Sequence, residues 1–177
     1  MKRTSRGFSV LEVMVVVAII GILLSVGVPS FFNYTQNMQI RSAAEQITAG
    51  LQIAKNEAIR RNSQAELALS NNTGWTITEV TSAGVRNVLQ SRNANEGSVN
   101  VTGAFLPAGT TTVTFNGMGR VVSVNDDGTP PLTQIDLDNP SISNVADRRN
   151  LRIVIPIGGA VRMCDPKVTG TDPRTCP

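Results

Sequence analysis

The stretch VMVVVAIIGILLSVGVPSFF, residues 13–32, decides the fold of this 177-residue chain. It is nearly all apolar, and no charged residue occurs after Glu12 until Arg41. As a helix it is long enough to cross the ~30 Å hydrocarbon core of a bilayer. Basic residues precede it and none follows directly, which is typical of an N-terminus held in the cytoplasm. We therefore predict a single-pass membrane helix, with the rest of the chain on the outer side.

A cleavable secretory signal and a buried core helix both fit this stretch less well. A secretory signal would share the basic start and the apolar run. However, this run is too long for a typical signal core, and no small-x-small cleavage site closes it. A buried core helix is also disfavoured, because helices that are apolar all round belong to large proteins or to membranes.

A carboxylate near the start of an apolar helix is costly and indicates a functional position. Here Glu12 ends the sequence GFSVLE, residues 7–12, after a short basic leader. This order of residues resembles the N-terminal signature of type IV pilins. The resemblance implies that prepilin peptidase cuts between Gly7 and Phe8 and that Phe8 is then N-methylated. It also implies that Glu12 pairs with the N-terminal amine of a neighbouring subunit during assembly.

Gly21 and Pro29 lie where pilins place a helix-loosening glycine and proline. Proline lacks an amide hydrogen, so Pro29 is expected to bend or break the helix locally. The resemblance implies that the segment between the two residues can melt when a subunit packs into a filament. A tolerated kink in a membrane helix is the alternative.

Composition excludes several classes of function. The chain has no histidine, which removes Ser-His-Asp and Cys-His catalysis, and its aromatic content of 4% argues against a stacking platform for single-stranded nucleic acid. The net charge of +3 comes from the three basic residues among the first seven, because the remainder has 16 − 3 = 13 basic and 13 acidic residues. We predict no catalytic residue and no enzyme activity.

After residue 32 the apolar pattern narrows to one side of a helix. Apolar residues recur at three- and four-residue spacing up to Arg61, with charged residues between them. We predict one helix from Phe8 to Arg61, whose first half is transmembrane and whose second half packs on a globular domain. The predicted division of the chain is a leader peptide at 1–7, a membrane and filament-core helix at 8–32, an amphipathic half at 33–61 and a β-rich periplasmic domain at 62–177.

Beyond Arg61 the apolar period becomes two, as in strands. The predicted fold class is α+β, the type IV pilin fold, with the long N-terminal α-helix packed on a C-terminal antiparallel β-sheet domain. The predicted strands are 65–69, 75–80, 85–91, 97–102, 111–116, 120–125, 133–137, 151–157 and 161–164. For the last hairpin, a three-residue loop at 158–160 keeps apolar residues on one face. It pairs Ile155 with Met163 and places Arg162 opposite Pro156.

Three segments narrow the resemblance. AKNEAIRR (54–61), TFNGMGR (114–120) and VRMCD (161–165) are similar to the GspH/FimT group of minor pilins and pseudopilins, which includes FimU-like members. The resemblance implies a minor pilin that primes or joins the type IV pilus. Its implied partners are prepilin peptidase, other minor pilins, the major pilin and the inner membrane. One alternative is the H-type minor pseudopilin of type II secretion, and another is a DNA-binding minor pilin for natural transformation.

The two cysteines, Cys164 and Cys176, lie on the outer side of the membrane in the predicted topology. That compartment is oxidising in bacteria, so a disulfide is predicted, with two free thiols as the alternative. Four aspartates are candidate calcium ligands, but the spacing of a calcium loop and its closing glutamate are missing, so no metal or cofactor is predicted. They are Asp126, Asp127, Asp136 and Asp138.

The segment after residue 147 has an excess of positive charge and is the candidate DNA contact. Some FimT-like pilins take up DNA through a Gly-Arg-x-Arg element, and the matching residues here are Gly159-Ala160-Val161-Arg162, which lack the first arginine. A solvated face is therefore favoured over DNA binding. The candidate contacts are Arg148, Arg149, Arg152, Arg162 and Lys167.

Overall fold

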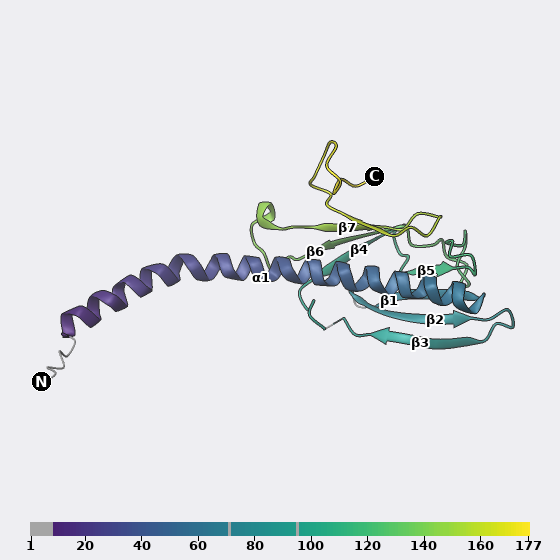
Figure 1. The fold of residues 1–177 in the computed structure, drawn as a ribbon, viewed down its shortest axis with the longest axis horizontal. Coiled ribbons are helices and arrows are strands. Elements are labelled where there is room, and N and C mark those ends of the chain that lie inside the picture. The colour runs from purple at the N-terminus through teal and green to yellow at the C-terminus, as the bar shows by residue number, and fades with distance from the viewer. Residues whose placement is uncertain (1–8, 71, 95) are drawn as a thin grey trace, which may run out of the picture. The chain divides into compact units, whose positions relative to one another are not determined.

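A computed structural model of the chain describes residues 9–177 except 71 and 95 (Figure 1). Its first element is the 52-residue helix α1, Val10–Arg61, which confirms the predicted long helix. Ser9 caps its start, because both the Ser9 carbonyl and the Ser9 hydroxyl oxygen accept the amide hydrogen of Glu12. At its end Asn62 takes a left-handed φ of 46°, a conformation that terminates helices.

The chain forms two compact units, Met1–Thr35 and Gln36–Pro177. In the first unit, α1 passes through Pro29 without a break, so the part of the prediction that allowed a broken helix is wrong. A proline removes one backbone donor, and the turns on either side keep theirs. The first unit therefore stays helical throughout its described part, apart from Ser9.

The second unit contains two four-stranded antiparallel sheets, in the orders β3-β2-β1-β5 and β4-β6-β7-β8. This confirms the predicted α+β class. The strands are β1 (Gln64–Ser70), β2 (Gly74–Val80), β3 (Arg86–Arg92), β4 (Thr102–Leu106), β5 (Thr112–Phe115), β6 (Gln134–Asp138), β7 (Leu151–Val154) and β8 (Arg162–Cys164); η1 (Val145–Asp147) is a single 3-10 turn.

The second half of α1 lies across the sheets and supplies one side of the core (Figure 1). Its buried stripe repeats every three or four residues and belongs to the same core cluster as buried residues of both sheets. The buried helix residues are Ile40, Ala43, Ala44, Ile47, Leu51, Ala54 and Ala58, all with no exposed surface. Small residues bring the helix close to the sheet: a Cβ at Gly50 would lie 2.9 Å from the Trp75 ring.

Two predicted strands are wrong. Residues 97–101 form turns, where Gly97 has a φ of +82° and Val101 donates to Ser98, so β4 begins only at Thr102. The stretch 120–125 makes an isolated bridge between Val121 and Phe115 and then turns. The stretch lies along the edge of β5 and forms no strand of its own, although its apolar residues alternate.

The predicted register of the last hairpin is also wrong, by two residues. Met163 pairs with Ile153, and Arg162 lies opposite Val154 rather than Pro156. Ile155 still continues the pairing on the β6 side, because its amide donates to the carbonyl of Thr133, the residue before Gln134, which pairs with Val154. Pro156 then offers no amide hydrogen. The loop is therefore 155–161.

Candidate assembly helix and C-terminal ring

The exposed half of α1 is the first candidate site. From Val10 to Leu24 all side chains are exposed, and Leu11 is 74% exposed. This helix is long and apolar enough to cross a membrane, by length and composition. Glu12 lies in its first turn and is the only carboxylate before Glu45. The predicted cleavage and methylation positions, Gly7 and Phe8, lie outside the described residues.

The predicted helix-loosening positions lie in this exposed half. A Cβ added at Gly21 would meet nothing within 4 Å, and the same is true of Gly27. Close packing within the described chain therefore does not require glycine at either position. Glycine lowers helix stability by about 1 kcal/mol relative to alanine, so the half that contains Gly21, Gly27 and Pro29 is intrinsically weak as a helix.

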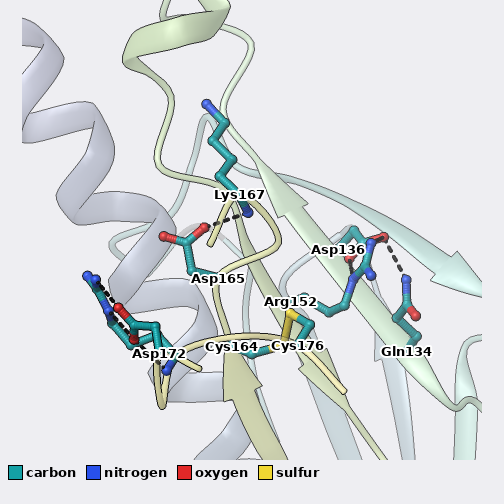
Figure 2. Close-up of a disulfide and its surroundings, with 9 residues drawn as sticks. Gln134, Asp136, Arg152, Cys164, Asp165, Lys167, Asp172 and Cys176 are labelled. Atoms are coloured by element: carbon teal, nitrogen blue, oxygen red, sulfur yellow. Dashed lines mark hydrogen bonds and ion pairs between the residues drawn. A yellow bond between two sulfur atoms is a disulfide. The ribbon is translucent and has the colours of Figure 1, made fainter. Parts of the chain in front are cut away.

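The second candidate site is the C-terminal ring, residues 164–176, closed by a disulfide (Figure 2). The sulfurs of Cys164 and Cys176 are 2.06 Å apart, which confirms the predicted disulfide. Within the ring, the amide of Asp165 donates to the Arg174 carbonyl at 2.8 Å. Cys164 also ends β8, so the disulfide joins the tail to the second sheet.

The five candidate DNA contacts do not act as one patch, because three of them are bonded inside the protein. Arg152 forms a two-point ion pair with Asp136, at 2.6 and 3.1 Å (Figure 2). This pair raises the pKa of the Arg152 guanidinium. Arg148 pairs with Asp138 at 2.9 Å and donates to the Ile142 carbonyl. Such pairs hold the guanidinium groups against the second sheet.

The third bonded cation is Lys167. Its ammonium donates to the backbone carbonyls of Arg148, at 2.6 Å, and Val145, at 3.0 Å. Arg149 and Arg162 are exposed, and no ion pair of either occurs in the described part of the chain.

The four candidate calcium ligands are also separated by other partners. Asp126 pairs with Arg86 at 2.9 Å. Asp127 accepts the hydroxyl and amide of Thr129, which lowers the pKa of its carboxyl group. Asp136 and Asp138 each pair with an arginine, as above. Among residues 9–70, 72–94 and 96–177, no group of three or more potential metal ligands lies close enough together to hold an ion.

Sequence reasoning missed a group of amides where α1 enters the second unit. The Gln36 side-chain oxygen accepts the amides of Asn139 at 2.9 Å and Asn100 at 3.1 Å. Asn37 donates to the Asp147 carbonyl at 2.9 Å and accepts the Arg149 backbone amide at 2.8 Å. The one available signal was the polar pair Gln36-Asn37, located where the apolar half has ended.

This long helix, half exposed and half packed on antiparallel sheets, defines a type IV pilin-like protein. The model of the family described as Type II transport protein GspH matches residues 43–159. The Prokaryotic N-terminal methylation motif matches residues 2–28. The chain therefore belongs to the GspH family of pilin-like minor pilins and pseudopilins.

Curated relatives match a part of the chain. A Fimbrial protein of Pseudomonas aeruginosa is 39% identical over 57 residues, which cover 32% of this chain and 36% of that protein. The Type IV major fimbrial protein FimA of Dichelobacter nodosus is 45% identical over 40 residues, covering 23% of this chain and 26% of that protein. The match therefore spans about a third or less of these relatives.

Solved structures share the fold of most of the chain. The type IV minor pilin FimU of Pseudomonas aeruginosa superposes with a TM-score of 0.55 and 18% identity, covering 76% of this chain and 97% of FimU. The minor pseudopilin EpsH of the Vibrio cholerae Type 2 Secretion System gives a TM-score of 0.51 and 14% identity, covering 73% and 99%. At these identities the likeness concerns the fold, and it extends to both a pilus protein and a secretion protein.

Proposed function

We propose that this protein is a minor pilin of the type IV pilus machinery, a structural subunit that primes or joins pilus assembly. The observation that carries this proposal is the exposed apolar half of α1. Large apolar side chains such as Val10, Ile22 and Leu23 are 79%, 68% and 66% exposed. An apolar surface of this extent is stable only against lipid or other helices. In this proposal lipid surrounds the helix before assembly, and the helices of other subunits surround it afterwards.

In this proposal the subunit is held in the inner membrane by residues 8–32, with a periplasmic domain at 62–177. Prepilin peptidase removes residues 1–7, and methylation of the new amine at Phe8 keeps that amine basic. The carboxylate of Glu12 then attracts the N-terminal amine of a neighbouring minor or major pilin. Attraction between opposite charges strengthens where helices exclude water, so the pair sets the register of the incoming subunit. No step of this function requires bond chemistry beyond processing.

The proposal is tested by deleting the gene and restoring it with tagged variants in the bacterium that carries it. Wild-type protein should restore pilus number and appear in the sheared pilus fraction. Glu12→Ala should be processed normally, incorporate poorly and give few pili, whereas the matched control Glu12→Asp, which keeps the charge, should be intermediate. Normal piliation and normal recovery of the alanine variant in sheared pili would refute the assembly role of Glu12.

A second candidate function is the H-type pseudopilin of type II secretion, because the GspH family model and the likeness to EpsH point to that system. The same deletion strain separates the two functions. Loss of surface pili with normal export of secreted enzymes supports the pilus. Loss of enzyme export with normal pili supports the secretion pseudopilus.

A DNA receptor is a less favoured function for this chain. Arg148, Arg152 and Lys167 already bond to groups of the protein, so binding phosphate would require those bonds to break. An electrophoretic shift of duplex DNA with the full chain in detergent, at near-physiological salt, tests this directly. A shift that is lost on replacing Arg149 and Arg162 would reinstate the DNA-binding function.

A further inference from the structure

We propose that Gln36 and Asn37 fasten α1 to the globular domain and stop helix unwinding from passing beyond them. We call this contact the neck clamp. The neck clamp is defined as these two side chains with Asn100, Asn139 and the backbone of residues 147–149. Its value for assembly rests on the function proposed above, but the clamp itself is a property of the single subunit.

The first half of the clamp is buried. Gln36 is 7% exposed and Asn139 has no exposed surface. The Asn139 amide donates to both the side-chain oxygen and, at 3.3 Å, the backbone carbonyl of Gln36. Asn100 supplies a second donor to the Gln36 side-chain oxygen. A buried amide that lost these partners would keep the cost of its desolvation, so the network strongly favours one position of the helix.

The second half of the clamp joins the helix to backbone. The Asn37 side chain both donates to the Asp147 carbonyl and accepts the Arg149 amide, as a neighbouring strand would. The held segment has a second bonding partner, because Lys167 donates to the carbonyls of Val145 and Arg148. The clamp thus connects the helix, through residues 145–149, to the disulfide ring.

The clamp lies directly after the weak part of the helix. Gly21, Gly27 and Pro29 all precede it, and each lowers helix stability. The boundary between the two compact units falls between Thr35 and Gln36, immediately before the clamp. Helix unwinding spreads residue by residue from a weak point, so a fixed side chain at Gln36 would stop it there. The domain could then keep its buried helical stripe while the apolar half changes conformation.

The test measures amide hydrogen exchange, resolved to single residues, on the full chain in detergent micelles. The variant Gln36→Met/Asn37→Ala removes the clamp while preserving or raising intrinsic helix propensity, so faster exchange cannot come from a poorer helix former. We expect amides 36–41 to exchange about tenfold faster, while amides 47–54 are unchanged. The matched control is Gln46→Ala, because Gln46 also bonds from α1 to the domain, at the Glu96 carbonyl, but lies outside the clamp.

A second substitution tests the stop directly. Val28 is 59% exposed, so Val28→Gly weakens the helix beside Pro29 without opening a core. Each helical amide donates to the carbonyl four residues earlier. With the clamp intact, unwinding up to residue 35 should therefore accelerate exchange up to residue 39 and leave it slow from Ile40 onward. In the Gln36→Met/Asn37→Ala background, the acceleration should extend beyond residue 39.

Two results would overturn the clamp. One is acceleration past residue 39 in Val28→Gly alone, and the other is a clamp variant whose exchange matches that of Gln46→Ala. Because the protein is unassembled in this experiment, such a failure is distinct from failure of the proposed function, which would appear as normal piliation without the subunit.

Discussion

Asp136 of β6 and Arg152 of β7 lie directly opposite each other and form a two-point ion pair. The pair joins a candidate calcium ligand to a candidate DNA contact, and both side chains are about one-third exposed, at 32% and 30%. The bonds between the two strands therefore use charges that would otherwise be available to ligands. Three other residues, Arg148, Asp138 and Lys167, are similarly engaged within the second sheet and its loops.

Replacing Arg152 should affect stability and leave DNA affinity unchanged. We expect Arg152→Gln to lower the free energy of unfolding by up to about 1 kcal/mol, since the pair is bidentate but partly solvated. Thermal melting and a gel-shift titration measure the two effects. Arg162→Gln, on an exposed residue of neighbouring β8, is the control and should not change the melting temperature. A large loss of DNA affinity in Arg152→Gln would contradict the structural role.

Opening the C-terminal ring should loosen more than the tail. A disulfide that closes a ring of this size stabilises by roughly 3 kcal/mol in the chain-entropy model, so Cys176→Ser should lower the melting temperature. Because Lys167 holds the carbonyls of Val145 and Arg148, amide exchange should also rise at 145–149. Lys167→Met, which leaves the ring closed, should raise exchange at 145–149 with a smaller loss of stability. Two alkylatable thiols in wild-type protein from the membrane fraction would disprove the disulfide.

Gly50 should tolerate no side chain. Alanine is the better helix former by about 1 kcal/mol, but its Cβ at this position would lie 2.9 Å from the Trp75 ring and 3.2 Å from Leu67. Overpacking of this kind costs about 1–3 kcal/mol, so Gly50→Ala should lower the melting temperature of the globular domain despite the gain in propensity. Gly27→Ala, where a Cβ meets nothing within 4 Å, should leave it unchanged. Equal melting temperatures for the two variants would argue against close helix–sheet contact.

The carboxyl group of Asp172 should titrate unusually low. Arg174 donates to it through its guanidinium and its backbone amide, which lowers the pKa of Asp172 to about 2. A lowered pKa means that this contribution to stability is complete above the ordinary value of 3.8 and is lost as the pH falls from 3.8 to about 2. A carboxyl-carbon NMR titration of wild type and Arg174→Gln measures this. The variant's pKa should return toward 3.8, and an unchanged value would exclude Arg174 as the cause.

Processing should depend on the small residue before the predicted cleavage position. Prepilin peptidase is expected to require glycine there, so Gly7→Val should leave an uncleaved precursor in the inner membrane. Gly7→Ala, which adds a single methyl group, is the graded control and should be cut slowly. Mass spectrometry of the N-terminus distinguishes the forms, and N-methyl-Phe8 at wild-type level in Gly7→Val would contradict the proposed processing.

The sequence by itself determined the elements whose signal is local. The apolar run at 13–32 and the spacing of Ile40, Ile47 and Leu51 specify a helix and its buried side, because each pattern repeats within a few residues. The disulfide between Cys164 and Cys176 followed from compartment chemistry. These features need no knowledge of distant partners.

Only the tertiary structure decided which distant groups meet. Gln36 and Asn139 are 103 residues apart, and no periodicity in either segment indicates that their amides bond. The register of the last hairpin was mispredicted because a shift of two residues keeps every side chain on the same face, so the apolar pattern allows Met163 to pair with either Ile153 or Ile155. Charges such as Arg152 likewise gain a role only when strand pairing places Asp136 opposite. Hydrogen bonds and ion pairs depend on positions in space, which chain order alone does not specify.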